Sequence, residues 1–285
     1  MSGRAWRKPG TASPLLLLDK RTNSGKGRQT TDWERVLTVR WFKEAGMLEF
    51  GKARVQRGKA PWIRGHGPKK PEDVERSVRR TRANVRRHCL NMGAAWITTL
   101  TYHENMKDRK KTLVDRQNFD RKMSKIYGDK WKWTGVIEKQ KRGAWHWHIA
   151  TAFQVDQAIA LQVWREVTGD PTITQVHTGF RPDGKGNAYG KCASYISKYI
   201  TKDMEQTEEL RHRYHVKRGS AVHVERFTIA LNAPRNTESM MMLDMACHFL
   251  GATEFSMWSA PVPAGAHYGY TVCERRQHQP EMGGT

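Results

Sequence analysis

The chain has 285 residues, of which 38% are hydrophobic, and 50 Lys and Arg against 28 Asp and Glu give it a net charge of +22. This length suffices for one core of about 150–200 residues with extensions, or for two small domains. The charge indicates a polyanionic partner, most often DNA or RNA, although a ribosomal-type or merely soluble basic protein shares it. The four cysteines lie too far apart for a zinc ribbon or a disulfide framework, and the apolar run at residues 15–18 is too short for a membrane span.

The positive charge is concentrated toward the N-terminus. Residues 1–90 contain 23 Lys and Arg against 8 Asp and Glu, whereas residues 225–285 contain 4 against 6. Residues 1–30 are rich in small polar and basic residues without hydrophobic periodicity, which predicts a flexible basic arm, and residues 31–50 predict a short helix or a hairpin. We therefore expect residues 1–71 to form a basic, partly flexible N-terminal region.

Helices and strands alternate in the central part of the chain. An arginine-rich helix is predicted to begin at Pro71 and to end before Gly93, because proline and acidic residues suit a first turn. The hydrophobic patterns then predict strands over 94–105, 131–140, 144–153, 171–177 and 222–231, and helices over 113–127, 156–167 and 188–202.

The order of these elements predicts the fold class. It is β-α-β-β-α-β with an added strand, which indicates an α+β, ferredoxin-like (split βαβ) antiparallel five-stranded sheet. We expect the helices on one face of the sheet and the other face free for a ligand. Residues 72–232 would form this domain, and residues 233–285 would form a C-terminal extension, partly disordered, with a Met-rich helix.

A candidate metal site lies on a predicted hairpin. His146 and His148 flank Trp147 within a strand, so period-two geometry places both imidazoles on one face and the tryptophan on the other. A three-residue turn at residues 141–143, ending in glycine, would place Glu138 opposite His146 on the same face. Two imidazoles and one carboxylate suit Mg²⁺ or Mn²⁺ when the cation must also bind a phosphate oxygen. The alternative is a pair of surface histidines.

A candidate nucleophile lies on the predicted helix over 188–202. Tyr195 and Lys198, and then Tyr199 and Lys202, repeat the pattern Y-x-x-K at a spacing of four, which places all four on one helical face. A phenol loses its proton near pH 10, so a nucleophilic tyrosine needs a polarised substrate and neighbouring cations such as these lysines. The alternative is an amphipathic helix with surface tyrosines.

Together these patterns resemble the HUH endonuclease superfamily of rolling-circle initiators. ITTLT at 97–101 resembles its first motif, HWH at 146–148 its histidine motif, and YISKYITKD at 195–203 its tyrosine motif. The arginine-rich helix leading into the first motif is most similar to replication proteins of filamentous and small single-stranded DNA phages and of related plasmids. The resemblance covers about residues 72–232.

The resemblance implies a reaction and roles for the residues. A tyrosine attacks a DNA phosphate with metal assistance, leaving a 5′-phosphotyrosyl enzyme and a free 3′-OH. His146 and His148 would be metal ligands and Glu138 the third. Tyr195 and Tyr199 would alternate as nucleophiles, or Tyr199 would act if only one does.

The implied partners are single-stranded or hairpin DNA at a replication origin, a host helicase and a host DNA polymerase in the bacterial cytoplasm. Basic side chains on the first helix and in the glycine-rich loop over 179–190 are candidates for DNA contacts: Arg79, Arg80, Arg86, Arg87, Arg181 and Lys185. Two alternatives remain. One is a transposase or relaxase-type strand transferase, although relaxases place the tyrosine before the histidines. The other is a non-catalytic nucleic-acid-binding protein on the same fold.

Overall fold

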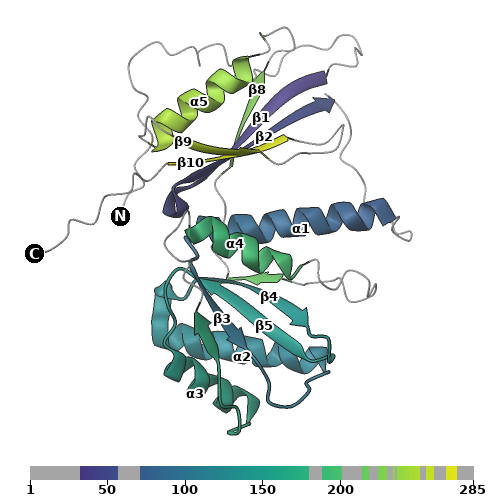
Figure 1. Cartoon of the computed structure of the whole chain (residues 1–285), viewed down its shortest axis with the longest axis vertical. Helices are drawn as coiled ribbons and strands as arrows, with labels where there is room; N and C mark the ends of the chain where they lie inside the picture. The colour runs from purple at the N-terminus through teal and green to yellow at the C-terminus, as the bar shows by residue number, and fades with distance from the viewer. Residues whose placement is uncertain are drawn as a thin grey trace, which may run out of the picture. The chain divides into compact units, whose positions relative to one another are not determined.

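Two five-stranded sheets organise the chain, each in its own structural unit (Figure 1). The computed structural model describes residues 33–56, 71–179, 188–200, 214–217, 224–229, 234, 236–250, 255–259 and 268–274. Among these residues no helix is both long and apolar enough to cross a membrane.

The first unit has strands in the order β8-β1-β2-β10-β9. A hairpin, rather than a helix, forms the N-terminal part of the unit, where the short helix η2 (Lys43–Ala45) joins two strands of ten residues each. The elements are β1 (Trp33–Phe42), β2 (Met47–Gln56), β8 (Val224–Ile229), α5 (Thr237–Leu250), β9 (Phe255–Ser259) and β10 (Tyr268–Glu274). The strand predicted over 222–231 is therefore present as β8, but it pairs antiparallel with β1 and not with the second sheet.

The second unit has strands in the order β6-β3-β5-β4-β7, and the neighbouring strands are antiparallel. The segment from β3 to β6 runs β-α-β-β-α-β, so the predicted α+β, ferredoxin-like arrangement is confirmed. The elements are α1 (Pro71–Asn91), β3 (Trp96–Leu100), α2 (Arg109–Tyr127), η3 (Gly128–Lys130), β4 (Trp133–Lys139), β5 (Trp145–Thr151), α3 (Gln157–Thr168), β6 (His177–Gly179), α4 (Ala188–Lys198) and β7 (Tyr214–Val216).

Tryptophans fill the core between this sheet and helices α2 and α3. Trp133, Trp147 and Trp164 are each at most 1% exposed and belong to one cluster with the apolar residues of α2. Their indole nitrogens do not remain unpaired: Trp147 donates to the carbonyl of Thr112, and Trp164 donates to the carbonyl of Thr101. The indoles therefore fix β3, β5 and both helices to one another.

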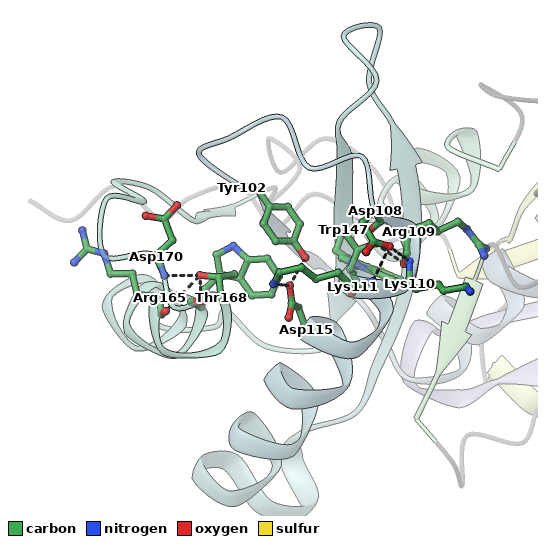
Figure 2. Close-up of polar contacts among 12 residues, drawn as sticks. Tyr102, Asp108, Arg109, Lys110, Lys111, Asp115, Trp147, Arg165, Thr168 and Asp170 are labelled. Carbon is green, nitrogen blue, oxygen red and sulfur yellow. Dashed lines mark hydrogen bonds and ion pairs between the residues drawn. The ribbon is translucent and has the colours of Figure 1, made fainter.

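A polar network anchors the start of α2 under β5 (Figure 2). The Asp108 carboxylate caps the helix by accepting from the backbone of Lys110 and Lys111. Within the first turns, the buried Asp115 carboxylate accepts from Tyr102 Oη at 2.9 Å and from Lys111 Nζ at 2.8 Å. A buried carboxylate needs such partners, so this network holds the start of α2 in one position.

Helices cover both faces of the second sheet, which corrects the expectation of one free face. In Figure 1, α1 and α4 lie on one side of the sheet, and α2 and α3 lie on the other. Val85 and Cys89 of α1 and Cys192, Ala193 and Ile196 of α4 are completely buried. Each of these helices has an apolar stripe that must leave water, and the sheet together with the other helix provides the surface.

Two element boundaries differ from the prediction. The strand predicted over 171–177 begins only at His177 and continues to Gly179. Helix α4 ends at Lys198, and Tyr199 and Ile200 follow in a tighter turn whose backbone N–H groups donate to Ile196 and Ser197. Tyr199 therefore lies at the end of the helix and not in its interior.

Candidate active site

The β4–β5 hairpin has the predicted turn and register. Gln140 donates its backbone N–H to Ala144 at 2.8 Å and closes a three-residue turn, in which Gly143 has a φ of 89°. Glycine takes this left-handed conformation without the steric cost of a β-carbon. Glu138 consequently pairs with His146 across the two strands, as the turn predicts.

The three residues predicted to bind a metal form one buried cluster. His146, His148 and Glu138 are 5%, 6% and 7% exposed, so they are not surface histidines on a strand. His148 Nε2 lies 2.8 Å from Glu138 Oε2. The hairpin therefore brings both imidazoles and the carboxylate together on the sheet face that α1 and α4 cover.

Two threonines of β3 and the residue after it contact the outer ring nitrogens of the histidines. Thr99 pairs with His148 across β3 and β5, and its Oγ1 lies 3.2 Å from His148 Nδ1. Thr101 Oγ1 lies 3.2 Å from His146 Nδ1. The sequence reasoning did not single out these contacts, although alternation within ITTLT was the signal that could have shown the two hydroxyls on one face.

A side chain of the hairpin turn also reaches the cluster. Gln140 Nε2 lies 3.3 Å from His146 Nδ1, and Gln140 Oε1 accepts from Arg142 Nε at 2.9 Å. Arg142 is exposed and brings a positive charge close to the histidines. Sequence reasoning treated these positions only as a turn, because a tip residue shows no pattern that links it to the strand face.

Both predicted tyrosines lie beside the histidine cluster. The ring of Tyr199 stacks on the ring of His148 with centroids 3.9 Å apart and an interplanar angle of 11°. Tyr199 Oη donates to Tyr195 Oη at 2.7 Å, and the two phenol rings meet edge to face. The turn at the end of α4 thus brings the last tyrosine of the motif onto the metal-site candidate.

Burial changes the protonation of these groups. Desolvation, followed by the positive charges of His148 and Arg142, lowers the pKa of His146 to about 4, although Glu138 opposes the shift. Desolvation also raises the pKa of Tyr199, and the hydrogen bond to Tyr195 and the negative charge of Glu138 raise it further. At neutral pH His146 is therefore the neutral imidazole that metals bind, and Tyr199 is a neutral phenol.

The cluster offers donor atoms for a cation without presenting them in a completed coordination geometry. Across the ranges that the structure describes, no three His, Cys, Asp or Glu side chains form a preformed cation site. His146 Nε2 is nevertheless buried without a hydrogen-bond partner among these residues. A buried nitrogen with nothing to bind is costly, and a cation ligated there together with Glu138 would remove that cost.

The remaining predicted residues are placed in part. Lys198 is exposed and is the last residue of α4, beside both tyrosines in the sequence. On α1, Arg79 and Arg80 are exposed, and Arg86 and Arg87 are half-buried. The other three predictions fall outside the described residues: Lys202, Arg181 and Lys185.

The second unit is thus a ferredoxin-like domain that holds a buried histidine–carboxylate cluster against a tyrosine pair. Residues 95–204 match the family model described as replication-associated protein ORF2/gene 2 protein. The matched segment extends from the residue before β3 to beyond α4, so it contains both histidines and both tyrosines, and it spans less than half of the chain. No curated protein and no solved structure matched the chain. The predicted resemblance to replication initiators is confirmed at the level of this family, which supports a role in the initiation of DNA replication.

Proposed function

We propose that the chain is an HUH-type rolling-circle replication initiator that nicks and rejoins single-stranded DNA through a tyrosine. The observation that carries the proposal is the stacking of Tyr199 on His148, at 3.9 Å between ring centroids. This contact puts a phenol beside a cluster of two imidazoles and one carboxylate. A structural tyrosine on an amphipathic helix would have no reason to share its site with buried metal-binding side chains.

Three residues would hold the metal in this proposal: His146, His148 and Glu138. Their nitrogen and oxygen atoms suit Mg²⁺ or Mn²⁺ better than a structural zinc, which prefers four protein ligands. When bound, the cation supplies Lewis-acid polarisation of the scissile phosphate. Glu138 would have to turn from His148 Nε2, which it now contacts at 2.8 Å.

The tyrosine supplies the covalent step. Tyr199 Oη attacks the phosphorus, the bond from phosphorus to the 3′ oxygen of the preceding nucleotide breaks, and that oxygen takes up a proton. The phenol loses its own proton in the same step, and the products are a 5′-phosphotyrosine and a free 3′-OH. Attack of that 3′-OH, or of one like it, on the phosphotyrosine reverses the reaction and rejoins DNA.

Tyr195 and Lys198 assist or alternate with Tyr199. Tyr195 Oη accepts the hydrogen bond of Tyr199 at 2.7 Å, so it can receive the phenol proton or act as the second nucleophile. The ammonium of Lys198, with that of Lys202, would stabilise negative charge that develops on the phosphate. DNA at a replication origin is the substrate in this proposal, and a host helicase and polymerase would extend the free 3′-OH.

A nicking assay tests the proposal. The purified chain is incubated with single-stranded origin oligonucleotides and Mn²⁺, and the products are separated on denaturing gels that retain protein–DNA adducts. We expect wild type and the control Tyr189→Phe, on the same helix, to nick and to form an adduct, and Tyr199→Phe to lose most of both. The double variant Tyr195→Phe/Tyr199→Phe should form none.

Two outcomes would overturn the proposal. The first is an adduct that persists in the double variant, which would show that the nucleophile lies elsewhere. The second is tight binding of the oligonucleotides by wild type without any nicking, which is what a non-catalytic nucleic-acid-binding protein would give.

A further inference from the structure

We propose that Thr99 and Thr101 are positioning residues that set the tautomers of His148 and His146 for metal binding. This inference rests on the proposed function, because it concerns the same metal site. Each hydroxyl oxygen lies 3.2 Å from the Nδ1 atom of one histidine. Two equivalent contacts from alternate residues of one extended segment indicate a shared role for the two threonines.

His148 shows why the hydroxyl matters. Its Nε2 lies 2.8 Å from the Glu138 carboxylate, which can only accept, so Nε2 carries the proton in this arrangement. Nδ1 then has a lone pair, and Thr99 donates its O–H to it. A cation needs the lone pair of Nε2 instead, so on binding the proton must reside on Nδ1.

A threonine hydroxyl accommodates both arrangements. Its O–H can rotate, so the oxygen donates to a bare Nδ1 and accepts from a protonated one at the same position. The imidazole thus keeps a hydrogen bond at Nδ1 whether or not Nε2 binds a cation. A carbonyl or a carboxylate would fix one tautomer, and valine, which has nearly the same shape, would support neither.

His146 follows the same logic with one more partner. The amide nitrogen of Gln140 lies 3.3 Å from His146 Nδ1, and Arg142 holds the amide oxygen at 2.9 Å. That amide nitrogen can only donate, so it favours the proton on Nε2, the buried nitrogen that has no partner among the described residues. Thr101 is the neighbour that can accept a proton from Nδ1 when Nε2 binds a cation.

A structural explanation for the threonines makes a different prediction. Threonine is common in strands because its β-carbon is branched, and valine meets that requirement equally well. Thr98, the neighbour of Thr99 on β3, pairs with Ile149 and is 1% exposed. It offers a control on the same strand for the effect of replacing a threonine hydroxyl by a methyl group.

The test measures metal binding directly. Titration calorimetry with Mn²⁺ and no DNA compares wild type with Thr99→Val, Thr101→Val, the conservative Thr99→Ser and the control Thr98→Val. We expect the first two to bind Mn²⁺ about 10–100-fold more weakly, in line with the usual cost of losing a partner behind a metal ligand. Thr99→Ser should bind within a few-fold of wild type, because the hydroxyl is retained.

A spectroscopic signature accompanies the binding data. Long-range proton–nitrogen NMR spectra of histidine-labelled protein with Mg²⁺ should show His148 protonated at Nδ1 in wild type and in Thr99→Ser, with the resonances assigned by His148→Gln. Mn²⁺ affinity in both valine variants equal to that of wild type would overturn the inference and leave the proposed function intact. No Mn²⁺ binding by wild type would overturn the metal dependence of the proposed function and this inference with it.

Discussion

Tyr199 combines a reactive position with an unreactive protonation state. Burial, the hydrogen bond to Tyr195 and the negative charge of Glu138 all raise the pKa of its phenol. The hydroxyl is therefore protonated at neutral pH, and in the proposed reaction it must lose its proton during the attack. A cation at the histidine cluster would offset the charge of Glu138 and lower that pKa again.

Asp120 allows a test of the core behind the site. Its Oδ1 accepts from both Trp131 Nε1 at 2.8 Å and Trp133 Nε1 at 2.7 Å, and both tryptophans are 1% exposed. We expect Asp120→Ala to lower the free energy of unfolding by about 2 kcal/mol or more, since each buried donor left unpaired costs about 1–3 kcal/mol. Urea denaturation measures the change.

The isosteric and surface variants make that prediction specific. Asp120→Asn keeps an acceptor oxygen and should lose about 1 kcal/mol or less. The exposed Asp129 of η3 serves as a control, and Asp129→Ala should change the free energy by no more than about 0.5 kcal/mol. Equal losses in Asp120→Ala and Asp129→Ala would show that the shared acceptor contributes nothing.

At the scale of the element, the packing of α1 against α4 determines where the tyrosines lie. Val85 and Cys89 of α1 are fully buried, as are Cys192 and Ile196 of α4. Tyr199 follows α4 in a turn, so a shift of this helix would move the phenol from His148. The short turn, and not a continued helix, is what directs Tyr199 toward the sheet.

Cysteine reactivity reports on this packing. Burial raises the pKa of Cys192 to about 12 and that of Cys89 well above its usual value. A raised pKa keeps each thiol protonated from pH 7 to 9, so the reactive thiolate is scarce and access is blocked as well. We expect iodoacetamide to leave Cys89 and Cys192 unmodified in the native protein while the exposed Cys247 reacts.

Peptide mass spectrometry gives the readout for each cysteine. In urea both buried thiols should become modified, which confirms that the reagent and the digestion detect them. Rapid modification of Cys89 and Cys192 in native protein at pH 7 would contradict close packing of α1 on α4.

The sequence predicted the parts of the site that depend on local periodicity. Alternation in HWH and the glycine at position 143 were sufficient for the register that pairs Glu138 with His146. The helix over 188–202 was predicted with one continuous face, but it ends at Lys198, because stacking on His148 depends on a contact between distant segments. The contacts of Thr99 and Thr101 depend on the β3–β5 register, which no turn in the sequence specifies.

The same limit applied to the arrangement of the sheets. The fold class followed from the order of the elements, and the second sheet confirms it. The strand Val224–Ile229 was assigned to that sheet because it follows in the sequence, yet it pairs with β1. Pairing between segments almost 200 residues apart in the chain leaves no local pattern to read.

At the scale of the whole molecule, the net charge of +22 predicts binding to DNA that weakens with salt. If the exposed Arg79 and Arg80 of α1 contact phosphates, replacing both with Gln should reduce the slope of log affinity against log salt by about 0.7 for each lost contact on single-stranded DNA. Fluorescence anisotropy with a labelled oligonucleotide between low and moderate salt gives the slope.

A control of equal charge separates contact from net charge. Arg121 and Lys125 are exposed on α2, the helix on the other side of the sheet, and their double Gln variant loses the same two charges. We expect that variant to keep the wild-type slope. Equal reductions in both variants would mean that the arginines of α1 act only through the overall charge.

The most direct test of the central claim maps the covalent DNA adduct to one residue. Wild type is reacted with an origin oligonucleotide and Mn²⁺, the DNA is trimmed with nuclease, and the protein is cleaved with trypsin. Cleavage after Lys191, Lys198 and Lys202 places Tyr195 in residues 192–198 and Tyr199 in residues 199–202, and fragmentation resolves the two if cleavage at Lys198 is blocked. We predict a nucleotide on Tyr199, with or without a second population on Tyr195. An adduct on any other residue, or none while the DNA is nicked, would contradict the account.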